Sequence, residues 1–192
     1  VTLTRTDTIT DKDGDSTSDG ESINLGNAIS FLDDGPSITV TASADPAAAS
    51  LQVDETTLAT DATANFTSLF SNNTPSYGTD GAGAVTSVYS LGIKASAQDS
   101  GLVDTATGQK VYLYLESGVV VGRVGAAGVA KADGAISFTV SNDAGSVTLD
   151  QQRALTHPTN PNNNEATTLS AADLVTLTRT DTITDKDGDS TS

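Results

Sequence analysis

Cysteine, methionine and tryptophan are missing from this 192-residue chain, and histidine occurs once, as His157. Without cysteine the chain has no disulfide framework, no thiol nucleophile and no cysteine metal site. A single histidine also excludes histidine-rich zinc sites and most designs for acid–base catalysis. The common routes to catalysis are therefore closed, and we expect a protein that is not an enzyme.

Positive charge is scarce, since 9 Lys and Arg residues stand against 25 Asp and Glu residues, a formal net charge of −16. Such an acidic surface repels phosphate backbones, so nucleic acids and anionic membranes are poor partners, whereas metal cations are good ones. No apolar run approaches the ~20 residues of a membrane span, so we expect no membrane insertion. The chain begins within a pattern and without a signal peptide, and we expect a fragment of a longer protein.

Aromatic residues make up only 4% of the chain, and Val, Ala, Leu and Ile supply most of its apolar content. Alternating runs bounded by Gly, Asn and Asp predict short strands and hairpins, above all residues 110–116 with 119–124 and residues 135–141 with 146–149. We therefore predict an all-β fold, an antiparallel β-sandwich of immunoglobulin-like type with long loops. One short helical turn is expected at residues 150–155, capped by Asp150.

The first eighteen residues, VTLTRTDTITDKDGDSTS, recur without change as residues 175–192, an offset of 175 − 1 = 174 residues. The simplest origin is a tandem array, because complete identity indicates modules that were duplicated recently. Such modules do the same structural work many times over. We expect residues 1–34 to be the C-terminal part of a preceding repeat plus its linker. Residues 37–192 would be a β-sandwich module that lacks its last strand, with 175–192 beginning the next copy. The segment 1–34 should then pair with the open edge of a neighbouring chain or fold back to fill it.

An acidic turn with alternating carboxylates around one glycine, D-K-D-G-D, occurs in both copies of the repeated segment. So many negative charges in one turn are unfavourable without a cation, and hard oxygen ligands favour calcium over zinc. The spacing is not that of an EF-hand loop, because Gly14 stands fourth from Asp11 rather than sixth. The alternative is a solvated acidic turn without a metal. The predicted calcium ligands in the two copies are Asp11, Asp13, Asp15, Asp185, Asp187 and Asp189.

Two further acidic pairs are candidates for calcium ligands. Asp33 and Asp34 precede Gly35 and Pro36, a break between regular segments at which we place the module boundary. We expect them to bind calcium at the junction of two modules; the alternative is an ordinary polar linker. Asp54 and Glu55, at the start of the module body, are weaker candidates.

Four segments resemble the extender repeats of giant bacterial RTX adhesins. They are T-D-K-D-G-D-S at residues 10–16, L-D-D-G-P-S-I at 32–38, V-D-E-T-T-L at 53–58 and V-T-L-D-Q-Q-R-A-L-T-H-P at 147–158. The resemblance implies β-sandwich modules joined end to end, type I secretion and an extracellular location on a bacterial cell surface. It also implies calcium at the linkers, with Asp11, Asp13 and Asp15 acting together with Asp33 and Asp34.

The function expected from this resemblance is that of a stalk. Calcium stiffens the linkers, and neighbouring identical repeats then project distal domains that bind the ligand in adhesion and biofilm formation. The alternative is a calcium-dependent ligand-binding module, for example one for carbohydrate. Exact repetition and the shortage of aromatic side chains to stack on sugars argue against that alternative.

Overall fold

The computed structural model describes residues 1–43, 49–158 and 164–192. By its internal contacts the chain divides into two units, Val1–Asp34 (unit 1) and Gly35–Ser192 (unit 2). The described residues form antiparallel strands and short 3-10 turns, and they contain no α-helix. The all-β prediction is thereby confirmed.

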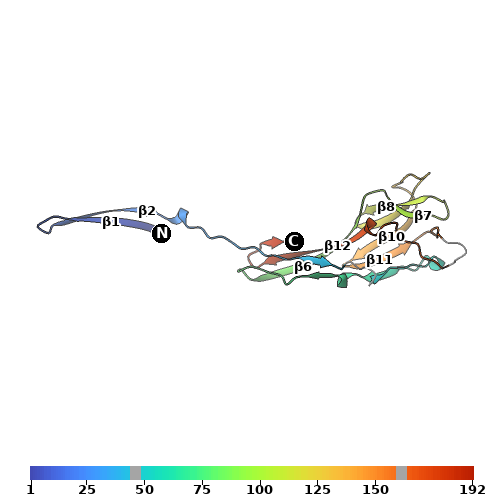
Figure 1. Cartoon of the computed structure of the whole chain (residues 1–192), viewed down its shortest axis with the longest axis horizontal. Helices are drawn as coiled ribbons and strands as arrows, with labels where there is room; N and C mark the ends of the chain where they lie inside the picture. The colour runs from blue at the N-terminus through green and yellow to red at the C-terminus, as the bar shows by residue number, and fades with distance from the viewer. Residues whose placement is uncertain (44–48, 159–163) are drawn as a thin grey trace. The chain divides into compact units, whose positions relative to one another are not determined.

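Unit 1 is a hairpin followed by a single 3-10 turn, η1 (Gly26–Ala28). Strands β1 (Thr2–Thr10) and β2 (Ser16–Asn24) pair with each other over their whole length and form a two-stranded sheet (Figure 1). Threonine and serine hydroxyls on one face of the hairpin bond across the strands, as Thr4 does to Ser22 at 2.6 Å. Because only two strands are present, every residue of both is exposed.

Unit 2 holds the remaining strands, and β6 and β12 lie side by side along it (Figure 1). Its 3-10 turns are η3 (Glu55–Thr57), η4 (Thr67–Leu69) and η5 (Ala172–Leu174). Its strands are β3 (Val40–Ala42), β4 (Ala62–Asn65), β5 (Phe70–Asn72), β6 (Ala82–Ile93), β7 (Gln98–Val103), β8 (Lys110–Glu116), β9 (Val119–Val124), β10 (Ile136–Asp143), β11 (Ser146–Gln151), β12 (Val175–Asp185) and β13 (Ser190–Thr191).

The described residues of unit 2 form three antiparallel sheets. The largest has six strands in the order β4-β11-β10-β9-β8-β7, so that β7 to β11 form a meander of consecutive hairpins. The second has the order β13-β12-β6, and β3 pairs with β5 in the third. Both predicted hairpins are present, as β8–β9 and β10–β11.

The hydrophobic core lies where β6 and β12 pack on the six-stranded sheet, and β6 contacts β8, β9 and β10. Burial alternates along β12, so that one face of this strand points inward, whereas β8 and β9 each bury consecutive residues. The core residues are Leu91, Leu102, Val111, Leu113, Val120, Phe138, Leu155 and Leu174.

The predicted helical turn at residues 150–155 is wrong. Strand β11 continues to Gln151, because Thr139 and Phe138 of β10 offer partners to Asp150 and Gln151. The Asp150 carboxylate accepts a bond from the Gln152 side chain rather than capping a helix. Tertiary pairing has outweighed the local preference. Of the 3-10 turns, η4 directly precedes β5 and η5 directly precedes β12.

Leu113 and Leu115 lie on the same face of β8 but differ in burial, since Leu113 is 0% and Leu115 45% exposed. We predict that Leu113→Ala lowers the free energy of unfolding by about 2–5 kcal/mol, through lost burial and a cavity. Leu115→Ala, the matched control, should cost under about 1 kcal/mol. Urea unfolding measures both values, and equal losses would contradict this placement of the core.

Candidate metal centre

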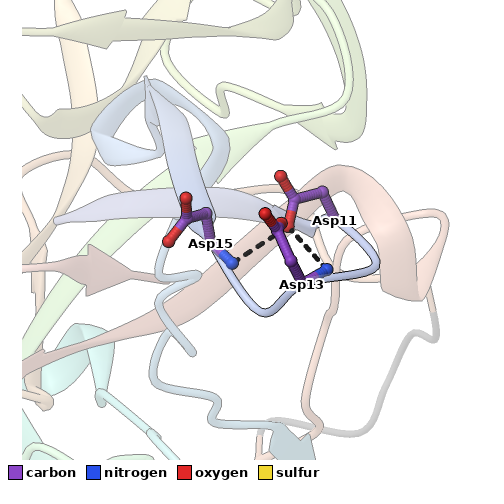
Figure 2. Close-up of side chains that lie close together, drawn as sticks. All are labelled: Asp11, Asp13 and Asp15. Carbon is purple, nitrogen blue, oxygen red and sulfur yellow. Dashed lines mark hydrogen bonds between the residues drawn. The ribbon is translucent and has the colours of Figure 1, made fainter.

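The acidic turn of the repeated segment is closed by its first carboxylate. In unit 1, Asp11 Oδ1 accepts the backbone N–H groups of Asp13 (3.3 Å), Gly14 (3.1 Å) and Asp15 (3.0 Å). Figure 2 shows two of these bonds, from Asp13 and Asp15. Gly14 has φ +104°, in the left-handed region that glycine tolerates best. The short side chain of aspartate and the following glycine therefore dictate the turn.

The second copy folds into the same turn. Asp185 Oδ1 accepts the N–H groups of Gly188 (3.1 Å) and Asp189 (2.8 Å), and Gly188 has φ +110°. The Asp185 N–H donates to the Asp189 carbonyl at 3.0 Å, matching the 2.9 Å bond from Asp11 to Asp15. The turn is thus a local property of the sequence, independent of its surroundings.

In unit 1 the turn gathers three exposed carboxylates. Oxygens of Asp11, Asp13 and Asp15 all lie within 4.8 Å of one another. A hydrogen bond with the Asp13 carboxyl, aided by the backbone N–H groups of the turn, lowers the pKa of Asp11 from its ordinary value. The group is therefore ionised over the physiological pH range.

In unit 2 a carboxylate from elsewhere in the chain joins the turn. Oxygens of Asp80, Asp185 and Asp187 lie within 4.8 Å of one another. Asp80 precedes β6, whereas the other two end β12 and enter the turn. Asp185 is only 3% exposed, and its Oδ2 atom is buried without a hydrogen-bond partner.

A bulge in the β6–β12 ladder places Asp185 beside this end of β6. The register shifts between Thr184, which pairs with Ala84, and Asp185, which pairs with Ala82. Gly83 lies between these two partners, and a Cβ there would collide with the carbonyl oxygens of Thr184 and Asp185. Glycine therefore permits the close approach, and such bulges commonly redirect a side chain.

Like charges in this cluster affect its protonation. The pKa of Asp187 is raised from 3.8 to about 6, first by its hydrogen bond with Asp185, then by desolvation and by the charges of Asp185 and Asp80. A carboxyl group surrounded by carboxylates resists losing its proton, because ionisation adds repulsion. A cation would relieve the same repulsion.

The donor set fits a hard divalent cation. Calcium takes six to eight oxygen ligands at about 2.4 Å, so two oxygens on one ion lie at most about 4.8 Å apart. Each cluster supplies three carboxylates within that limit. Backbone carbonyls and water complete the shell at many calcium sites.

The other predicted ligands lie in different surroundings. The backbone N–H of Asp189 donates a hydrogen bond to the Asp185 carboxylate. Asp33 and Asp34 are exposed at the end of unit 1. Asp54 caps η3 through a 2.8 Å bond from the Thr56 N–H. A hydrogen bond from the Thr56 side chain, followed by this backbone bond, lowers the pKa of Asp54. Glu55 Oε1 accepts bonds from Gln151, Leu155 and His157. The assignment of these residues as calcium ligands stays a prediction.

Asp80 was missed by sequence reasoning. It stands in a Thr-Asp-Gly stretch that is typical of a turn and lies far from the repeated segment in the chain. Its role becomes visible only when β6 is known to pair with β12, because that pairing joins segments far apart in the chain.

The domain family DUF5801, described as a domain of unknown function, matches residues 50–192. The chain belongs to the DUF5801 family. No curated protein and no solved structure matches the chain. The DUF5801 match includes Asp80, β6 and β12, so the unit 2 cluster lies within the family domain. Among the described residues, no helix is long and apolar enough to cross a membrane.

The raised pKa of Asp187 predicts a pH-dependent stability in chelator. Folded Asp187 binds its proton more tightly than unfolded Asp187, so this contribution to stability is complete below pH 3.8 and is lost as pH rises through about 6. Asp187→Asn should therefore match the wild type near pH 3.5 and become relatively more stable by pH 7. Thermal melts across this range measure the difference. Asp61→Asn, at an exposed site of the same unit, controls for net charge. A difference that does not change with pH would contradict the prediction.

Proposed function

We propose that this DUF5801 chain is a structural extender of a calcium-dependent bacterial cell-surface adhesin. Modules joined end to end form a stalk, and calcium bound by carboxylates stiffens it, so that distal domains reach their ligand. The observation that carries the proposal is the unchanged recurrence of residues 1–18 as 175–192. Identical tandem modules suit a spacer, whose length is set by the number of copies.

The fold is compatible with that role. Unit 2 is an antiparallel sandwich-like body with strands β6 and β12 running along it, and β-sandwich domains commonly serve as cell-surface modules. Each copy of the repeated segment ends in the same acidic turn, so an array would present that turn once per repeat.

In the proposed stalk, calcium would make the stability of the module depend on whether the chain lies in a compartment with high or low free calcium. Extracellular modules bind calcium with dissociation constants of about 0.1–1 mM. An ion that binds only the folded state stabilises it by mass action. The cluster of Asp80, Asp185 and Asp187 includes a buried carboxylate oxygen that lacks a protein partner, which supports a site for the ion. The proposed module would thus be least stable where free calcium is low.

Thermal unfolding tests the calcium part. We predict that 10 mM calcium raises the melting temperature over chelator by about 3–10 °C, from a stabilisation of about 1.4–2.7 kcal/mol. Asp80→Asn and Asp187→Asn should remove most of this shift. Asp13→Asn changes the equivalent residue in the exposed copy and should leave it nearly intact. An equal melting temperature in calcium and chelator, with magnesium as a further control, would refute the calcium site.

Small-angle X-ray scattering tests the stalk part on a protein of three consecutive repeats. We predict a larger maximum dimension in calcium than in chelator, because the linkers lose their freedom to bend. Asp33→Asn combined with Asp34→Asn in every linker should abolish the difference. An unchanged dimension would refute the stalk, whether or not calcium binds. A glycan array probed in calcium would detect the alternative function as a ligand-binding module.

A further inference from the structure

The same eighteen residues occupy two different environments. Strand β12 lies between β6 and β13, whereas β1, with the same sequence, pairs only with β2. Ile183 of β12 is 0% exposed, while Ile9, the same residue of the repeat, is 70% exposed. One sequence is thus seen both with and without the strand that buries it.

The buried face of β12 makes specific polar contacts with its neighbours. Asp181, only 1% exposed, accepts a 2.9 Å bond from the Asn72 side chain and is paired with Arg179 at 2.7 Å. The Arg179 guanidinium lies 5.9 Å from the centre of the Tyr89 ring, within range of a cation–π contact. Asn72 belongs to β5 and Tyr89 to β6, so two other strands of the module contribute to the contacts of Arg179 and Asp181.

The corresponding face of β1 keeps its internal pair but has no such cover. Arg5 and Asp7 bond to each other at 3.0 Å, and both side chains are largely exposed. Leu3 and Ile23, which pair across the hairpin, are 58% and 61% exposed. An apolar face on a sheet with an unpaired edge is a template for another strand.

We propose that the free edge of β1 pairs with strand β6 of a second copy of the module, in the register that β12 occupies in its own unit. This face of the hairpin would then be covered as the buried face of β12 is. Since Thr182 pairs with Thr86 and Thr178 with Ser90, Thr8 would lie opposite Thr86, and Thr4 opposite Ser90. Arg5 would then reach Tyr89, and Asp7 would reach Asn72, of that second copy. The inference needs neither calcium nor a cell surface, and it goes beyond the stalk proposal.

The β1–β2 hairpin presents the strand sequence of β12 in a preformed, extended state. Nine residue pairs join β1 to β2, from Thr2 with Asn24 to Thr10 with Ser16. The intact β2 strand therefore holds β1 extended and ready to pair. The advantage of β12 is its covalent tether, which gives it a high effective concentration beside β6. Weakening β12 should let the hairpin of another molecule take its place.

Disulfide trapping tests the register of this pairing. Because the chain has no native cysteine, only the introduced cysteines can form disulfides. A donor chain carries Thr8→Cys or Thr4→Cys. An acceptor chain carries Ile183→Ala, which weakens its own β12, together with Thr86→Cys or Ser90→Cys. In a glutathione buffer we expect heterodimers from Thr8 with Thr86 and from Thr4 with Ser90. The two crossed pairings are four residues, about 13 Å, out of register, and should give at least about tenfold less.

Two further variants of the donor chain distinguish specific docking from disulfides formed by random collision. Ile9→Asp places a charge on the docking face and should abolish the heterodimer. Thr6→Asp adds the same charge on the opposite face, where the equivalent Thr180 is exposed, and should leave the heterodimer intact. Equal yields from all four pairings, or no sensitivity to Ile9→Asp, would overturn the proposal.

Folding of the acceptor is checked by circular dichroism. Should Ile183→Ala unfold it, the acceptor with native Ile183 is used instead. The same two in-register heterodimers are then expected, formed more slowly as β12 exchanges. The absence of in-register heterodimer from this folded acceptor would equally overturn the proposal.

Discussion

The antiparallel ladder between β6 and β12 is the interaction on which both the core and the acidic cluster of unit 2 depend. Near one end it pairs Leu91 with Leu177, which pack in the core, and at the other it brings Asp185 beside the segment that holds Asp80. A slip of one residue would turn Ile183 outward and carry Asp185 away. Hydrophobic burial therefore fixes the position of the carboxylates, even though the carboxylates themselves repel one another.

The repeated segment separates what local sequence dictates from what the rest of the fold adds. Strand, turn and the left-handed glycine appear in both copies, because the aspartate side chain and the glycine act within a few residues. Burial differs completely between Ile9 and Ile183, because it depends on a partner strand. A strand of this kind forms a hairpin in unit 1, where two exposed strands give little stability, and it becomes part of a packed module only where it pairs with β6.

The parts of the fold that sequence predicted are those with short-range causes. The hairpins β8–β9 and β10–β11 follow from alternation and from turn residues between adjacent strands. The predicted helical turn at residues 150–155 is wrong, because the β10–β11 ladder extends to Gln151, further than the local sequence indicated. In the cluster, Asp185 and Asp187 followed from the D-K-D-G-D pattern, but Asp80 did not, because it approaches them through the long-range pairing of β6 and β12.

The buried oxygen of Asp185 makes the end of the ladder sensitive to the solution around it. A buried carboxylate oxygen without a partner is costly, and nearby carboxylates increase the cost. A proton on Asp187 relieves the repulsion only up to a pH of about 6. Above that pH the cation proposed for this cluster would provide the relief instead. Because the same ladder buries Ile183, relief of charge at this end would be transmitted directly to the stability of the module edge.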